Sequence, residues 1–111
     1  METKELIEAT CPDCRGPLSQ IQHDEGVLEY QCLVGHAYSA RALLAAHADA
    51  QEKALWAAAL ALEEAANIVR AVSPELPPGL AERLQRQVQV KLGQAAEIKN
   101  ILERLEPFET E

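Results

Sequence analysis

The chain has 111 residues and a formal net charge of −8 at pH 7, and 48% of its residues are hydrophobic, many of them alanine. This length suits one domain, or one small module joined to a helical element. Few aromatic residues are present, which argues against a β-sandwich, and the negative charge argues against a nucleic-acid partner. No secretory signal and no apolar stretch of membrane-spanning length is found, so we expect a cytoplasmic protein without membrane contact.

Residues 1–38 have the composition of a small β-structure. They hold all three cysteines, both tyrosines and several turn sequences. The segments 18–22 and 27–31 read as two strands of a hairpin whose loop lies around Asp24-Glu25-Gly26. A third short strand is predicted over residues 6–9.

A long first helix is predicted after this part, because no Gly or Pro occurs between Tyr38 and Ser73. Ser39 is a favourable N-cap, and the helix is expected from about Ala40 to about Val72. Its apolar positions step by four and three residues, which is the spacing of a heptad seam. The seam consists of Leu44, Ala48, Leu55, Ala58, Leu62, Ala65, Val69 and Val72, with Gln51 as the one polar member.

A proline-rich turn over residues 74–79 must end this helix, and Pro77 and Pro78 are suited to open the next one. The second helix is predicted over residues 80–106, and its short link to the first makes the two an antiparallel hairpin. Gly93 is expected to lie opposite Ala59, where close helix packing would offset its helix cost. The second seam consists of Leu84, Val88, Leu92, Ala95, Ile98, Leu102 and Leu105.

The residues with the clearest chemistry lie in the first part. Cys11-Pro12-Asp13-Cys14 is followed, after seventeen residues, by Cys32-Leu33-Val34-Gly35-His36. Zinc prefers four thiolate or imidazole ligands at tetrahedral corners, and two ligands in one tight turn can wrap around an ion. The spacing therefore predicts a Zn²⁺ site formed by Cys11, Cys14, Cys32 and His36. We expect positive φ angles at Gly16 and Gly35, and backbone N–H groups directed at the thiolates.

Other interpretations of these residues remain open. Three buried free cysteines without a metal are one of them, and His23 or His47 as the fourth ligand is another. A catalytic zinc keeps one coordination position open for water. Four protein ligands fill that shell here, so we expect a structural zinc and no enzyme activity.

These features predict an α+β fold that is mostly α. It comprises an N-terminal zinc ribbon over residues 1–38, a β-hairpin with two knuckles, followed by a long antiparallel α-hairpin over residues 39–111. The hairpin consists of a first helix over 39–73, the turn over 74–79 and a second helix over 80–106.

Part of the sequence resembles a known bacterial module. The matching residues are Cys11-Pro12-x-Cys14-x-Gly16-x-Leu18, Tyr30-x-Cys32-x-Val34-Gly35-His36-Ala37-Tyr38-Ser39, Ala54-Leu55-Trp56-Ala57-Ala58 and Leu60-x-Leu62-Glu63-Glu64. They resemble the zinc-ribbon-plus-helix C-terminal extension of some chemotaxis-type protein-glutamate methylesterases, over about residues 9–70. The resemblance implies the same four zinc ligands and a bacterial signalling setting. The esterase domain is absent, so the resemblance implies no catalytic residue here.

The function predicted from the sequence is a non-catalytic, zinc-binding protein–protein interaction or assembly module. We expect a homodimer formed through the helices, and a further protein partner that the sequence does not identify. Trp56 is expected to pack against the ribbon or a partner helix. The alternatives are a nucleic-acid-binding zinc ribbon, which the acidic composition disfavours, and a zinc-thiolate redox switch, which depends on solvent access to the sulfurs.

Overall fold

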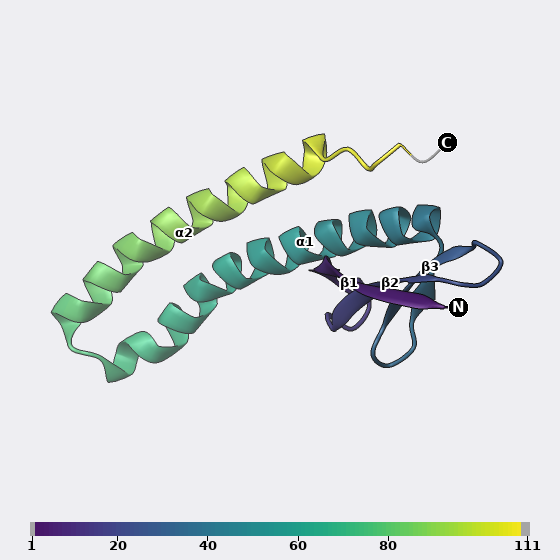
Figure 1. Cartoon of the computed structure of the whole chain (residues 1–111). Helices are drawn as coiled ribbons and strands as arrows, with labels where there is room; N and C mark the ends of the chain where they lie inside the picture. Colours follow the sequence, from purple (N-terminus) through teal and green to yellow (C-terminus); the bar gives the residue numbers. More distant parts are fainter. Residues whose placement is uncertain (1, 110–111) are drawn as a thin grey trace. The chain divides into compact units, whose positions relative to one another are not determined.

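The computed structural model describes residues 2–109. A four-stranded antiparallel sheet, in the order β1-β2-β3-β4, is followed by two long helices (Figure 1). The predicted α+β, mostly α fold is confirmed. The elements are β1 (Thr3–Thr10), β2 (Pro17–Gln22), β3 (Leu28–Cys32), β4 (Ala37–Tyr38), α1 (Ala40–Val72), a 3₁₀ turn η1 (Ser73–Glu75) and α2 (Pro78–Arg104).

The predicted hairpin corresponds to β2 and β3, which pair regularly with Leu18 opposite Cys32. Its turn is closed by the N–H of His23, which donates to the carbonyl of Val27 at 2.9 Å. Gly26 in this turn has φ +82°, a conformation that costs glycine little. The strand predicted over residues 6–9 corresponds to β1, which is longer than predicted. Its pairing with β2 is irregular between Leu6 and Thr10.

The core of the sheet coincides with the cysteine cluster. Cys11, Leu18 and Cys32 are buried together, and three half-buried side chains pack against them. These three are Ile7, Tyr38 and Leu43. Tyr38 belongs to β4, a two-residue strand that the sequence analysis did not predict. Because thiols and apolar side chains share one small core, the sheet has little apolar burial apart from the cysteines.

The helix boundaries agree with the sequence signals. The Ser39 hydroxyl accepts a hydrogen bond from the N–H of Ala42 at 3.2 Å, so Ser39 caps α1 as predicted. After the 3₁₀ turn, Pro78 occupies the first turn of α2, where its missing N–H is not needed. None of the helices among the described residues is long and apolar enough to cross a membrane.

The chain divides into two compact units. One contains the sheet and extends to Gln51, together with the segment after Glu106, and the other spans Glu52–Glu106. In the second unit, the buried residues are Ala59 of α1 and Val88 and Ala95 of α2. Lys99 of α2 forms an ion pair with Glu63 of α1 at 2.8 Å, on the same inter-helix boundary.

The predicted seam is correct for α2, where every member is buried or half-buried. In α1, Ala48, Leu55, Leu62, Ala65 and Val69 are half-buried as predicted, whereas Ala58 is exposed and its neighbour Ala59 is fully buried. The predicted contact of Gly93 with Ala59 is wrong. A Cβ atom at Gly93 would meet nothing within 4 Å, so this glycine faces open space and not the neighbouring helix.

Replacing Gly93 by alanine is therefore expected to stabilise the helical unit by about 1 kcal/mol, because alanine loses less backbone freedom in a helix and meets no steric obstacle. Chemical denaturation followed by circular dichroism measures this gain. Gly35→Ala is the contrasting variant, because Gly35 has φ +101° and an alanine there is strained. A loss of stability in Gly93→Ala would show that this position has a neighbour.

Candidate metal centre

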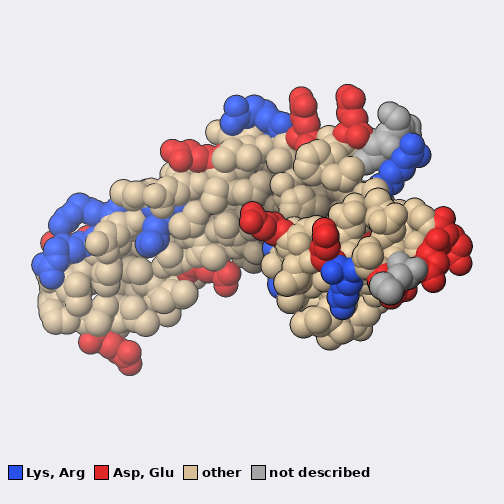
Figure 2. Space-filling view, in the orientation of Figure 1, with Lys and Arg blue, Asp and Glu red and all other residues tan. Residues whose placement is uncertain are grey.

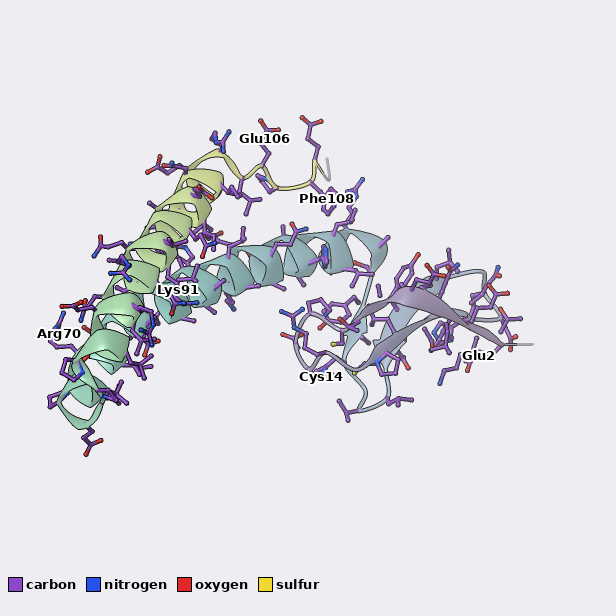
Figure 3. The ribbon with its side chains drawn as sticks, turned by 90° about the vertical axis from the view of Figure 1, so that its left-hand side faces the viewer. Glu2, Cys14, Arg70, Lys91, Glu106 and Phe108 are labelled. Carbon is purple, nitrogen blue, oxygen red and sulfur yellow. The ribbon has the colours of Figure 1, made fainter. Side chains whose placement is uncertain are left out.

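The structure brings the four predicted ligands together. The ligand atoms of Cys11, Cys14, Cys32 and His36 all lie within 4.8 Å of one another. Cys11 directly follows β1, Cys14 lies in the turn before β2, Cys32 ends β3 and His36 precedes β4. In Figure 3 the yellow sulfur atoms lie close together beside the label of Cys14. The antiparallel sheet thus places two sequence-distant turns against one another.

The first turn is held by backbone hydrogen bonds on both sides of the cysteine pair. The N–H of Cys11 donates to the carbonyl of Gly16 at 2.7 Å, and the N–H of Arg15 donates to the carbonyl of Cys11 at 2.8 Å. The positive φ of this turn, +65°, belongs to Arg15 and not to Gly16, contrary to expectation. Gly16 has a different role, because a Cβ atom there would lie 3.4 Å from the Cys14 sulfur.

The second turn has the predicted geometry. Gly35 has φ +101°, and its N–H donates to the carbonyl of Cys32 at 3.2 Å. The backbone N–H of His36 donates to the Cys32 sulfur at 3.3 Å. The expected N–H groups directed at the thiolates are therefore present, and they stabilise negative charge on sulfur.

The imidazole of His36 turns one specific nitrogen toward the sulfurs. Its Nδ1 atom lies 3.3 Å from the Cys32 sulfur and 3.6 Å from the Cys11 sulfur. A metal ion in this group would therefore be bound by Nδ1, with the proton of the neutral ring on Nε2.

Tyr38 is a contact residue that the sequence analysis missed. Its hydroxyl lies 3.4 Å from the Cys11 sulfur and donates a hydrogen bond to the carboxylate of Asp13. Asp13 and then Cys11 raise the pKa of Tyr38, so the hydroxyl stays protonated. The available signal was its position two residues after His36, because alternate residues of a strand share one face.

The pKa values of the three thiols and the imidazole are shifted in different directions. Burial raises the pKa of Cys32, but the N–H groups of His36 and Val34 outweigh it and lower this pKa to about 6. Burial also opposes ionisation of Cys11, whose pKa is lowered by Tyr38 and by backbone N–H groups. The Gly16 N–H lowers the pKa of Cys14, but desolvation and the two neighbouring thiols leave it raised. Hydrogen bonds to Cys32 and Cys11 raise the pKa of His36.

This pattern fits a bound cation. Three thiolates so close together repel one another, and the neighbouring thiols contribute to the raised pKa of Cys14. A divalent ion at the centre would offset this repulsion. Three sulfurs and one imidazole nitrogen are a donor set that Zn²⁺ accepts in tetrahedral geometry. The four residues can therefore hold a metal ion such as zinc.

The other two histidines lie outside this group. His23 is hydrogen-bonded through Nδ1 to Glu2 at 3.0 Å and through Nε2 to Glu29 at 3.4 Å. The ring of His47 stacks on Phe108, with a centroid separation of 6.4 Å. Of the three histidines, the structure places only His36 among the cysteine sulfurs.

His23 gives the ribbon a specific pH dependence. Hydrogen bonds to Glu29 and Glu2 raise the pKa of His23 above its ordinary value of 6.5. The stabilisation by the protonated ring is thus complete below pH 6.5 and is lost as the pH rises through the folded-state pKa. Thermal unfolding of the metal-loaded protein between pH 5.5 and 8.5 should show a steeper loss of stability for the wild type than for His23→Gln. Equal slopes for the two proteins would contradict this link of His23 to Glu2 and Glu29.

No protein-family model, curated protein or solved structure matches the chain. The fold and the site define an antiparallel ribbon with a three-cysteine, one-histidine group, joined to a helical hairpin. The geometry of this group supports metal binding by itself.

Proposed function

We propose that the chain binds one structural Zn²⁺ through Cys11, Cys14, Cys32 and Nδ1 of His36. The observation that carries the proposal is the approach of all four ligand atoms to within 4.8 Å of one another. Four protein ligands complete a tetrahedral shell and leave no position for a reactive water. The proposed role of the ion is to hold the two turns together, in a protein that acts by binding other proteins and not by catalysis.

The proposed binding surface lies on α1. From Ala54 to Val72 this helix has only three charged residues, Glu63, Glu64 and Arg70, and Glu63 is already paired with Lys99. By contrast, charged residues recur along the whole of α2. Figure 2 shows extensive uncharged surface over the helices on the face that it displays. Such a surface on a solvated helix is typical of a protein–protein contact.

Several large apolar side chains remain exposed in the helical unit. Trp56, which was expected to be packed, is 51% exposed, and Leu60 is 57% exposed. Two helices that pack together bury one stripe of each helix and leave the outer faces exposed to solvent. Further helices are therefore needed to cover these residues. The other exposed members are Ile68 and Val72 of α1, and Val90 and Ile101 of α2.

We propose a second copy of the chain as this neighbour, forming a four-helix bundle about a twofold axis. Lys53 and Glu64 support it. They are eleven residues apart, which is close to three full turns, so they lie on the same flank of α1. In an antiparallel pair of α1 helices, Lys53 can face Glu64 of the partner subunit, and the same pair forms again across the axis. Within the chain, neither side chain has an ion-pair partner among the described residues.

Leu60→Glu tests the dimer. The added carboxylate would have to be buried at the interface, so we expect the dimer dissociation constant to rise about tenfold or more, equivalent to at least about 1.4 kcal/mol. Sedimentation equilibrium of the zinc-loaded protein at micromolar concentration measures it. Gln85→Glu is the matched control, because it adds the same side chain at an exposed position of α2. A monomeric wild-type protein would remove the homodimer and leave this surface for a different protein.

The proposed ion pairs have their own test. Lys53→Glu and Glu64→Lys should each weaken the dimer, because each places like charges across the axis, whereas the double variant should restore it. Added salt should reduce the difference between the variants. A double variant as weak as the single ones would show that another register or another face forms the contact.

A further inference from the structure

The three cysteines of the metal group differ in their access to solvent. Cys11 is fully buried and Cys32 is 7% exposed, whereas Cys14 is an exposed residue. Gly16 contributes to this difference, because a side chain there would begin 3.4 Å from the Cys14 sulfur. The absence of a side chain leaves that side of the sulfur uncovered. An oxidant in solution therefore reaches Cys14 before the other two.

Hydrogen bonding also differs among the three sulfurs. The Cys11 sulfur contacts the Tyr38 hydroxyl at 3.4 Å, and the Cys32 sulfur accepts the N–H of His36 at 3.3 Å. The N–H donor withdraws electron density from the Cys32 thiolate and reduces its attack on electrophiles, and the Tyr38 hydroxyl, which donates its proton to Asp13, lies against the Cys11 sulfur. The Cys14 sulfur interacts with the N–H of Gly16 and with the two other cysteines. Because backbone N–H groups reach both Cys14 and Cys32, access to solvent is the property that singles out Cys14.

We propose that Cys14 is a site of reversible oxidation by peroxides, and that its oxidation releases the metal ion. The proposal rests on the zinc site proposed above. In the first step the Cys14 thiolate attacks one oxygen of hydrogen peroxide. The S–O bond forms, the O–O bond breaks, and the departing hydroxide takes a proton from solvent, which leaves Cys14 as a sulfenic acid and releases one water.

In the second step the Cys11 thiolate attacks the Cys14 sulfur. The S–S bond forms, the S–O bond breaks, and the second hydroxide is protonated to water. The two thiolates have then given two electrons to the peroxide, and Zn²⁺ keeps its oxidation state. We assign Cys11 as the second cysteine because it shares one tight turn with Cys14, so the disulfide closes a short loop.

The consequence is confined to the ribbon. Once Cys11 and Cys14 are joined, only Cys32 and His36 of the second turn remain as ligands, and two ligands bind Zn²⁺ far more weakly than four. The second turn then separates from the first. No metal ligand lies in the unit spanning Glu52–Glu106, so the helices of that unit keep their own packing.

The experiment exposes the zinc-loaded, full-length protein to hydrogen peroxide and follows zinc release with a chromophoric chelator. Dimedone traps sulfenic acids in parallel, and peptide mass spectrometry locates the adduct and the disulfide. The expected results are a first adduct on Cys14, a Cys11–Cys14 disulfide, loss of the bound zinc, and recovery of binding after reduction and addition of zinc. A first adduct on Cys11 or Cys32, or retention of zinc after oxidation, would overturn the proposal.

Gly16→Ala provides the structural test of access. Its methyl group would lie against the Cys14 sulfur at 3.4 Å, so zinc release by peroxide should slow several-fold while zinc affinity changes little. Gly93→Ala is the control, because it makes the same substitution far from any neighbour. Unchanged kinetics in a zinc-loaded Gly16→Ala protein would overturn the role given to access. A wild-type protein without zinc before peroxide is added would instead refute the metal site itself.

Discussion

Replacing His36 by alanine is expected to abolish stoichiometric zinc binding and to unfold the ribbon. Three sulfurs without the imidazole leave the tetrahedral shell incomplete, and in small metal modules the metal contributes on the order of 10 kcal/mol of folding free energy. The ribbon core cannot replace this contribution, because two of its three buried members are the cysteines themselves. Elemental analysis measures the metal content, and amide hydrogen exchange measures the loss of protection in β1 to β3.

The other two histidines are the matched controls for this variant. His23→Ala and His47→Ala remove the same ring from positions outside the ligand group, so both proteins should keep one zinc per chain. Cys32→Ser should reproduce the effect of His36→Ala. Retention of zinc by His36→Ala, together with its loss from either of the other histidine variants, would show that the fourth ligand has been assigned incorrectly.

Replacing Ala95 by aspartate is expected to unfold the helical unit while the ribbon keeps its metal. Ala95 is 2% exposed and lies on the face of α2 that packs against α1. An unpaired carboxylate buried at such a position costs on the order of 3–5 kcal/mol. The unit has only two other buried residues among those described, Ala59 and Val88. Few buried contacts therefore remain to stabilise it after the substitution. Circular dichroism during urea unfolding measures the loss.

Ala96→Asp is the control for this change, because Ala96 is the adjacent residue and is exposed. It makes the same substitution in the same helix turn, so the difference between the two variants isolates the cost of burial from the lower helix propensity of aspartate. Equal stabilities for the two proteins would show that Ala95 is not packed against α1 in solution.

The ends of the helices could be predicted because single residues specify them. A serine hydroxyl satisfies the free N–H groups at the start of α1. The prolines after Ser73 cannot continue a helix, and Pro78 is favourable in the first turn of a new one. These effects act within one or two helical turns, so a local sequence window contains all the information that they require.

The packing of α1 could not be predicted to the same accuracy. Ala57, Ala58 and Ala59 are identical in size and hydrophobicity, so periodicity alone does not distinguish which of them faces α2. Packing against α2 determines which of the three alanines is buried, and the buried one is Ala59. The error at Gly93 lies on the other helix, because Ala59 is buried as that contact required, whereas Gly93 is not a member of the α2 seam.

The grouping of Cys11, Cys14, Cys32 and His36 was predictable because a zinc site requires particular residue types at particular spacings, whatever the rest of the fold. The residues that surround these four side chains were less predictable. β4 has only two residues, so the one signal for Tyr38, its position two residues after His36, was too weak to predict its contact with the Cys11 sulfur. The left-handed conformation at Arg15 was also missed, because glycine is the usual residue at such positions and the adjacent Gly16 was chosen.

The order of the ligands along the chain determines when the site can form during synthesis. All four lie between residues 11 and 36, and the side chain of α1 that packs against their core, Leu43, follows shortly after. Chains fold from the N-terminus as they leave the ribosome. The proposed metal site can therefore form before α2 has emerged from the ribosome. A nascent chain would then present a finished ribbon while its helices still lack their partners, so thiol protection precedes assembly.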